Sequence, residues 1–138
     1  MRITLESDYA LRIITALAEE GTLIDAKALA EKTQVSQRFA LKILHKLVQG
    51  GLVASQKGAK GGYLLDKPPA SITLKAVIEL IDGPIGIVRC LGNTESCTLN
   101  SDKNACAFHH IFDKLSFDVS SKLAAITIAD ILAKNYVI

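Results

Sequence analysis

The sequence predicts a mostly α-helical fold with one small β-hairpin. Three observations support this. Apolar residues recur at spacings of three and four in several segments, as on the buried face of a helix. A pair of short β-prone runs, 52–56 and 63–65, is separated by a glycine-rich turn, as in a hairpin. Capping or breaking residues, such as Asp25, Ser36 and Asp82-Gly83-Pro84, separate the segments from one another.

The N-terminal segment predicts two helices. The first is expected to open at Ser7 and Asp8, to carry a wide apolar face, and to end near Gly21. Asp25 is expected to cap the second, which covers residues 26–32. A short turn then leads to a longer third helix, so the two helices and the turn have the layout of a helix-turn-helix unit.

The third helix is strongly amphipathic. Ser36 is a good N-cap residue, and Gly50-Gly51 is a suitable stop because glycine adopts the left-handed conformation found just past helix ends. Its apolar positions are spaced for one buried face: Phe39, Ala40, Ile43, Leu44, Leu47 and Val48. The opposite face is polar and basic.

The basic residues are concentrated in this helix and the following hairpin. Residues 36–62 contain five Lys or Arg and no acidic residue, whereas the rest of the chain has 11 basic and 14 acidic residues. A local positive patch is what phosphate binding requires. A solvated charged face is the alternative for the helix alone, but it does not account for lysines on a glycine-rich tip. We therefore predict a winged helix-turn-helix that binds DNA through Ser36, Gln37, Arg38, Lys42, Lys46, Lys57 and Lys60.

The second half predicts three more helices. The first covers 74–81, and a long one begins at Ala105. Thr127 is expected to cap a last one over 128–134. The long helix has an apolar seam that a second copy of the chain would bury, or else it folds back on its own domain: Phe108, Ile111, Phe112, Leu115, Val119, Leu123 and Ile126. We expect a DNA-binding domain over 1–82 and a cysteine-bearing loop with a dimerisation helix over 83–138.

All three cysteines lie in a polar loop predicted over 90–104 and at its end. Cys90, Cys97 and Cys106 fall within seventeen residues, and His109 follows three residues later. Thiolates are soft ligands suited to iron–sulfur clusters and zinc. No CxxC pair of the kind common in zinc sites is present. Ordinary idle thiols are the alternative, although free cysteine prefers the core to a polar loop.

Several classes of protein are disfavoured. No apolar run approaches the ~20 residues that span a membrane. Charged residues interrupt the N-terminal apolar pattern, so we expect no signal peptide and a cytoplasmic protein with reduced thiols. We find no glycine-rich nucleotide loop, nucleophile elbow or suitably spaced carboxylate pair, so an enzyme is not expected.

Taken together, these segments resemble the Rrf-two family of bacterial winged-helix transcription regulators along nearly the whole chain. The matching stretches are SDYALRII, LAEKTQVSQRFALKILHKLVQGGLV, SQKGAKGGYLL, ITLKAVIELIDGPI and the three-cysteine loop. The resemblance implies a homodimer on palindromic promoter DNA. In several members it also implies an iron–sulfur cluster whose loss, oxidation or nitrosylation changes DNA binding.

By the same resemblance, Cys90, Cys97 and Cys106 match the three thiolate ligands. The fourth ligand is either His109 or Asp8, the latter supplied by the partner chain, and the cluster is of the 2Fe–2S or 4Fe–4S type. Departures from the family pattern are the longer gaps between the cysteines, a leucine at position 41 where a base-selective glutamate occurs, and Lys57 in place of a wing arginine.

The sequence therefore supports one main hypothesis, a dimeric regulator, a repressor among the possibilities, whose promoter binding responds to an iron–sulfur cluster as a redox or nitric oxide sensor. The alternative is a cluster-free winged-helix regulator that senses by thiol oxidation or by binding a partner protein.

Overall fold

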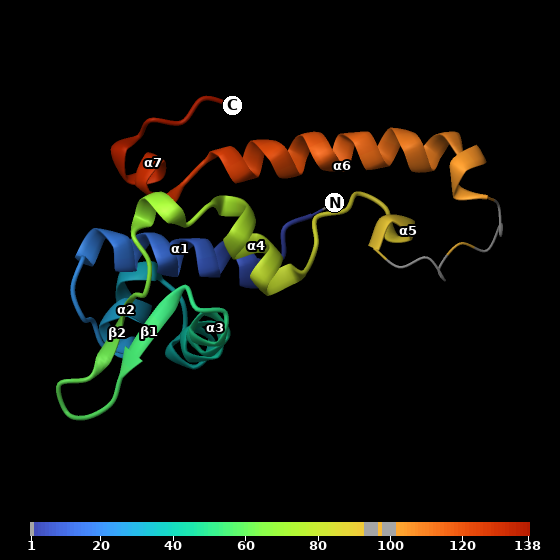
Figure 1. The fold of residues 1–138 in the computed structure, drawn as a ribbon. Helices are drawn as coiled ribbons and strands as arrows, with labels where there is room; N and C mark the ends of the chain where they lie inside the picture. Colours follow the sequence, from blue (N-terminus) through green and yellow to red (C-terminus); the bar gives the residue numbers. More distant parts are fainter. Residues whose placement is uncertain (1, 93–96, 98–101) are drawn as a thin grey trace.

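A computed structural model describes residues 2–92, 97 and 102–138 of the chain (Figure 1). It confirms a mostly helical fold with one two-stranded antiparallel sheet. Short 3-10 turns occur at Pro69–Ser71 and Lys103–Ala105. The helices and strands are α1 (Leu5–Glu20), α2 (Ala26–Thr33), α3 (Gln37–Gln49), β1 (Val53–Gln56), β2 (Gly62–Leu65), α4 (Leu74–Asp82), α5 (Arg89–Gly92), α6 (Ala107–Ala125) and α7 (Ile128–Ala133).

Helix α1 begins earlier than the sequence predicted. Its N-cap is Thr4, whose side chain accepts a hydrogen bond from the backbone N–H of Ser7. Ser7 is fully buried within the first turn, so the prediction that Ser7 and Asp8 open the helix was wrong. Gly21 ends the helix in the left-handed conformation, with φ of 66°, as expected.

The other predicted caps are present. Asp25 accepts from the N–H of Ala28, and Ser36 accepts from that of Phe39. Thr127 forms a reciprocal capping box with Asp130 at the start of α7. Because each cap satisfies backbone groups that the helix leaves free, these residues fix where the helices start.

The wing is the antiparallel hairpin of β1 and β2, in which Val53 pairs with Leu65 and Gln56 with Gly62. Ile24 extends it through two backbone hydrogen bonds with Tyr63, of 3.0 and 2.8 Å. Gly62 is required here, because a Cβ at this position would lie 2.4 Å from the carbonyl oxygen of Ile24. The backbone of the wing is thereby attached to the segment between α1 and α2.

The core lies between α1, α3 and α4, with α2, β1 and α7 closing its sides. Its largest fully buried side chains are Ile13, Ile14, Leu17, Leu29, Ile43, Leu44, Leu47, Ile72 and Ile128. Ile128 comes from α7, which packs on α1 (Figure 1). The division of the chain at residue 82 stays a prediction, but the core of the first part includes this residue from the second.

Helix α6 differs from its prediction at both ends. It begins at Ala107, and Cys106 precedes it with extended backbone angles, φ −87° and ψ 106°. The predicted placement of Cys106 inside the helix, one turn before His109, was therefore wrong. Ile126 lies just past the last turn. The predicted loop overlaps α5, which includes Cys90, while residues 93–96 and 98–101 of the loop lie outside the described residues.

Much of the apolar seam of α6 has no cover within the single chain. Phe108, Ile111 and Leu115 are 72%, 53% and 45% exposed. The adjacent face of α6 contacts the rest of the chain through Ser116. The Ser116 hydroxyl accepts a hydrogen bond from the N–H of Ile87 and donates one to the carbonyl of Phe112. No helix in the ranges 2–92 and 102–138 has the length and apolarity that a membrane crossing requires.

Candidate nucleic-acid interface and cysteine site

Helix α3 lies beside the wing, at the side of the molecule away from α6 (Figure 1). Its inner face is buried through Ala40, Ile43, Leu44 and Leu47, and this packing leaves the opposite face in solvent. Of the seven residues predicted to contact DNA, Lys46 is half-buried. The other six are exposed: Ser36, Gln37, Arg38, Lys42, Lys57 and Lys60.

A hollow of about 440 Å³ lies beside the N-terminal part of α3, and it is lined by Ser36, Arg38, Phe39 and Lys42. The Lys42 ammonium lies 5.5 Å from the centre of the Phe39 ring, within cation–π range. Phe39 in turn packs edge-on against Tyr9 of α1, with the ring centres 5.6 Å apart. This series of contacts orients Lys42 along the exposed edge of α3.

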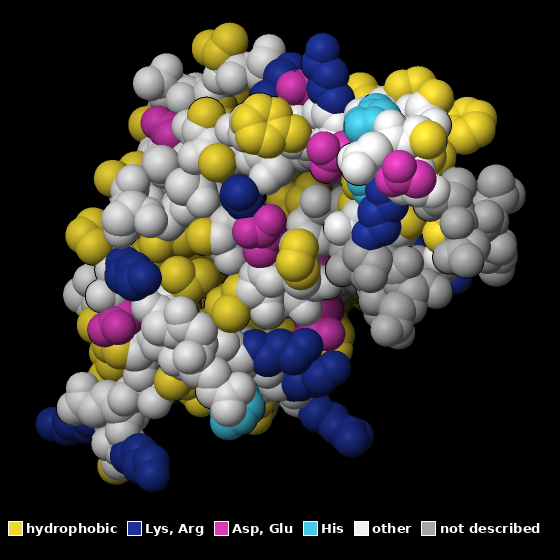
Figure 2. All heavy atoms as spheres, turned by 45° about the vertical axis from the view of Figure 1, so that its right-hand side comes forward, with side chains coloured by type: hydrophobic (Ala, Val, Ile, Leu, Met, Phe, Trp, Pro, Cys, Tyr) yellow, Lys and Arg dark blue, Asp and Glu magenta, His cyan; other side chains and the backbone are white. Residues whose placement is uncertain are grey.

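The lysines of the wing lie at the hairpin tip, where Gly58 takes the left-handed conformation with φ of 111°. Figure 2 shows Lys and Arg side chains gathered along the lower edge of the molecule, both over the wing and over α3. The fold thus presents the residues of the predicted DNA contact set on neighbouring elements.

One residue of this surface was missed by sequence reasoning. Glu6 of α1 binds Lys46 through Oε1 at 2.7 Å and Lys42 through Oε2 at 3.5 Å. The hydrogen bond and charge of Lys46 lower the pKa of Glu6, outweighing the effect of its partial burial. The partners are about forty residues apart in the sequence, so no local pattern could have revealed the pair.

The cysteine region is built around the starts of α5 and α6. Cys90 Sγ lies 3.7 Å from Nδ1 of His109. Cys90 and Cys106 are half-buried, whereas Cys97 is exposed. Among the described residues, no three His, Cys, Asp or Glu side chains are gathered closely enough to hold a metal ion. The structure thus brings together one predicted thiolate and one predicted imidazole ligand.

The neighbouring His110 has a different partner. Its Nε2 donates to the carbonyl oxygen of Asn104 at 2.9 Å, so this ring is held by backbone. His109 is the histidine that faces a thiol. Thiolate sulfur and imidazole nitrogen are both known ligands of iron–sulfur centres, so the donor set fits such a cluster in its chemistry.

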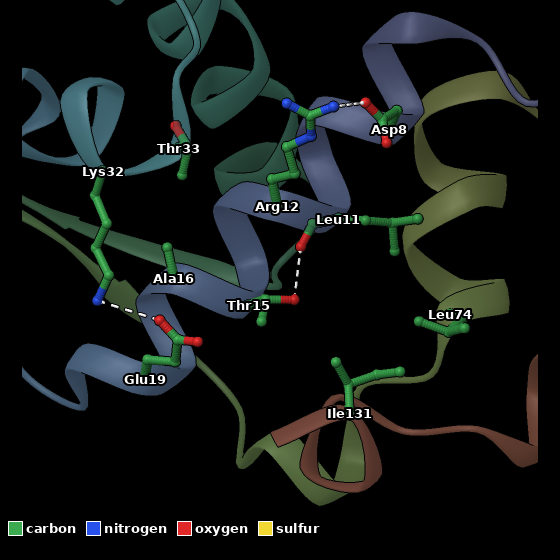
Figure 3. Close-up of a pocket in the computed structure, with 10 residues that line it drawn as sticks. All are labelled: Asp8, Leu11, Arg12, Thr15, Ala16, Glu19, Lys32, Thr33, Leu74 and Ile131. Atoms are coloured by element: carbon green, nitrogen blue, oxygen red, sulfur yellow. Dashed lines mark hydrogen bonds and ion pairs between the residues drawn. The ribbon is translucent and has the colours of Figure 1, made fainter. Parts of the chain in front are cut away.

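Asp8, the other candidate fourth ligand, lies elsewhere in the same chain. It forms an ion pair with Arg12 at 2.7 Å on α1. Both line an open groove of about 490 Å³ between α1, α2, α4 and α7, whose apolar floor includes Leu74 and Ile131 (Figure 3). A ligand role for Asp8 would therefore require a second copy of the chain to bring its groove to the cysteines.

Comparisons with known proteins agree with this geometry. Residues 3–134 match the model of the Rrf2 family, described as iron-dependent transcriptional regulator. A putative HTH-type transcriptional regulator, rrf2-like, of Rhodobacter capsulatus is 31% identical over 95% of this chain and 92% of its own length. The HTH-type transcriptional regulator IscR of Yersinia pestis is 32% identical over 96% of this chain and 79% of its own.

Solved structures show the same fold. CymR (YrzC), the global cysteine regulator of B. subtilis, superposes with a TM-score of 0.80 at 24% identity, covering 97% of this chain and 98% of that one. IscR of T. potens superposes with a TM-score of 0.78 at 22% identity, covering 97% and 88%. The matched relatives are transcriptional regulators and not enzymes. The chain therefore belongs to the Rrf2 family of DNA-binding transcriptional regulators, as its recognition helix and wing predicted.

Proposed function

We propose that this regulator binds double-stranded promoter DNA as a homodimer, and that an iron–sulfur cluster on Cys90, Cys97 and Cys106 controls the binding. The observation that carries the cluster is the contact between the Cys90 thiol and the His109 imidazole. It places a thiol of α5 beside an imidazole of α6, and both groups are of types that bind metals.

On DNA, the N-terminal turn of α3 would enter the major groove. Gln37, Arg38 and Lys42 are exposed there and would reach base edges and nearby phosphates. Lys57 and Lys60 at the wing tip would contact the flanking minor groove. In a dimer the two recognition helices would occupy successive major grooves about one turn (~34 Å) apart.

The dimer would form through α6. Its exposed stripe of Phe108, Ile111 and Leu115 is apolar and continuous with the face that already contacts the body. A second copy of this chain offers an apolar-floored groove beside Asp8 that such a stripe could cover. Because the stripe begins two residues after Cys106, this packing would bring the cysteines of one copy toward Asp8 of the other.

The chain's own residues would hold the cluster as thiolates at the three cysteines, with His109 or the partner's Asp8 as the fourth ligand. When bound, the cluster would supply a centre that oxidants or nitric oxide can alter. The His109 ring already lies beside the Cys90 thiol, which slightly favours His109 as the fourth ligand. Cys106 directly precedes α6 and Cys90 contacts His109 within it, so binding there would connect the site to the proposed dimer contact.

Anaerobic purification followed by an absorption spectrum and iron and sulfide analysis tests the cluster. We expect a brown protein with acid-labile sulfide, and loss of both in Cys90→Ala, Cys97→Ala and Cys106→Ala. His109→Ala should shift the spectrum or weaken retention, with His110→Ala as the matched control because that ring binds backbone. A colourless protein with three free thiols would contradict the proposal.

A cluster-free sensor is the second candidate. It is favoured by the exposure of Cys97 and by the lack of a three-ligand group among the residues that the structure describes. In that case DNA binding should be lost on mild peroxide treatment and restored by dithiothreitol, without any iron content. Binding of a partner protein is the remaining route, and an effect that appears only in cell extract would indicate it.

Salt dependence tests the DNA docking separately. If each chain neutralises four to five phosphates, the plot of log affinity against log salt concentration should have a slope of roughly −7 to −9 for the dimer. A slope near −2 on the best available site would contradict the proposed docking.

A further inference from the structure

The carboxylate of Glu6 lies between two lysines of the recognition helix. It approaches Lys46 at 2.7 Å and Lys42 at 3.5 Å. The Glu6 side chain is only 19% exposed, against 37% for Lys46 and 57% for Lys42. Lys46 is therefore held toward the body, whereas Lys42 keeps most of its reach into solvent.

The backbone fixes the position of this carboxylate. Glu6 is the second residue of α1, two positions after the Thr4 cap. Thr4 is tied to the end of α4, because both its N–H, at 3.1 Å, and its hydroxyl donate to the carboxylate of Asp82. Asp82 also attracts Lys46 electrostatically. Two anchored carboxylates thus act on the same lysine.

The remaining cations of the proposed DNA surface are different. Within the described part of the chain, Arg38, Lys57 and Lys60 form no ion pair. Counterions are released from DNA only when a cation of the protein neutralises a phosphate. Lys46, already neutralised by a carboxylate, contributes little until Glu6 is displaced.

We propose that Glu6 competes with DNA phosphate for Lys46, and to a smaller extent for Lys42, and so limits the affinity of the recognition helix for duplex DNA. The proposal rests on the docking of α3 described above. It assigns Glu6 as a positioning residue, because it would act on DNA through the lysines without touching it. Its effect would fall mainly on sequence-independent binding, to which phosphate contacts contribute most.

A purely structural role for Glu6 predicts something else. An acidic side chain in the first turn of a helix stabilises it through the helix dipole, typically by ~0.3–1 kcal/mol. Its loss would then lower the melting temperature and leave the salt dependence of DNA binding unchanged. Salt dependence is therefore the readout that separates the two roles.

The test measures fluorescence anisotropy of a labelled random-sequence duplex titrated with protein at several salt concentrations. We expect Glu6→Gln to steepen the log–log slope by about 0.9 for each phosphate gained, hence about 2 for a dimer, and to raise affinity roughly 3- to 10-fold at low salt. Glu20→Gln is the matched control, because it removes an equal charge from the same helix and a similar pair, with Lys32 at 3.4 Å.

The second arm is the double variant Glu6→Gln/Lys46→Gln, in which most of the gain should disappear because the freed lysine is absent. Should Glu6→Gln fail to fold, Glu6→Asp keeps the helix-terminal charge, withdraws the carboxylate from Lys46 and should show a smaller gain of the same sign. Slopes equal to those of the unaltered chain and of Glu20→Gln would overturn the proposal.

Binding of Arg38→Gln distinguishes a failure of the proposed α3 docking from a failure of the proposed role of Glu6. If the unaltered protein binds duplex weakly and Arg38→Gln makes no difference, the docking of α3 itself is wrong. If Arg38→Gln weakens binding but Glu6→Gln leaves it unchanged, only the role of Glu6 is wrong.

Discussion

The winged-helix body, formed by α1–α4, the wing and α7, buries its apolar side chains, whereas helix α6 leaves much of its apolar surface exposed. In the body, α1, α3 and α4 enclose side chains such as Ile13, Leu44 and Val77 that have no exposed surface. In α6, which is longer than any of these helices, the only buried residue is Ser116, and Phe108 is 72% exposed. The body is thus complete within one chain, whereas α6 leaves apolar area that a second copy could cover.

This contrast separates two kinds of energetic dependence. Truncating a single buried side chain of the body should lower its free energy of unfolding, and this free energy should not vary with protein concentration. The state of α6 should depend on concentration, because its apolar stripe gains cover only by association. Four predictions test the contrast, from the largest expected effect to the smallest.

Ile128→Ala should have the largest effect. Ile128 is fully buried against the body, so the lost contacts and the cavity should lower the free energy of unfolding by about 2–5 kcal/mol. Urea unfolding followed by circular dichroism measures this. Ile138→Ala makes the same change at a side chain that is 87% exposed, and should have almost no effect. Equal losses in the two variants would mean that α7 is not part of the core.

Ile111→Glu tests the exposed stripe. A charge placed in an apolar dimer contact should raise the dimer dissociation constant at least about 100-fold, or about 2.7 kcal/mol, while the folded chain persists. Sedimentation velocity over a range of concentrations gives the measurement. Phe117→Glu is the control, because Phe117 is 70% exposed on a different face of α6. If only Phe117→Glu dissociates the protein, the stripe has been assigned to the wrong face.

Arg38→Gln tests whether the DNA-binding surface lies on the winged-helix body. Arg38 is exposed in the first turn of α3, and its loss should weaken binding to the best duplex by about 1–3 kcal/mol. Anisotropy titration at fixed salt measures the change. Lys134→Gln removes a charge just after α7 and should leave binding within error. Comparable losses in both would indicate a general charge effect only.

Low pH should weaken the contact between α1 and α4 slightly. Burial raises the pKa of Asp82, but the hydrogen bonds from Thr4 outweigh it, so the folded-state pKa lies below the ordinary value. The unfolded chain then binds more protons, and this stabilising contribution is lost as the pH falls below about 4. Because Asp82 is exposed, the effect should be only a few tenths of a kcal/mol. Urea midpoints between pH 7 and 3.5 should fall less steeply for Asp82→Asn, and an unchanged slope would refute the assignment.

The sequence predicted those parts of the fold that depend on neighbours three or four residues away. Ser36, Asp25 and Thr127 were identified as caps because each cap bonds the backbone within its own first turn. The start of α1 was misplaced because Ser7 is an equally good capping type, and only the tie of Thr4 to Asp82, far along the chain, distinguishes them. α5 was missed because four residues are too few to establish a helical period.

The candidate site shows the same limit. The residues of the basic patch follow from composition and helical spacing, and the structure exposes most of them. The pairing of Glu6 with Lys46 depends on how α1 crosses α3, which no pattern along the chain encodes. The cysteine ligands remain predictions, since spacing alone identifies suitable atoms without fixing their distances.

The return of the chain to its own beginning has a consequence for biosynthesis. Ile128 donates its N–H to the carbonyl of Ile72, and Leu74 donates to that of Ile126, so the start of α7 is joined to the start of α4. A nascent polypeptide cannot cover this side of α1 until the ribosome has passed α7. The recognition helix is thus translated long before the body that supports it is closed, and a ribosome stalled within α6 would hold an unfinished core.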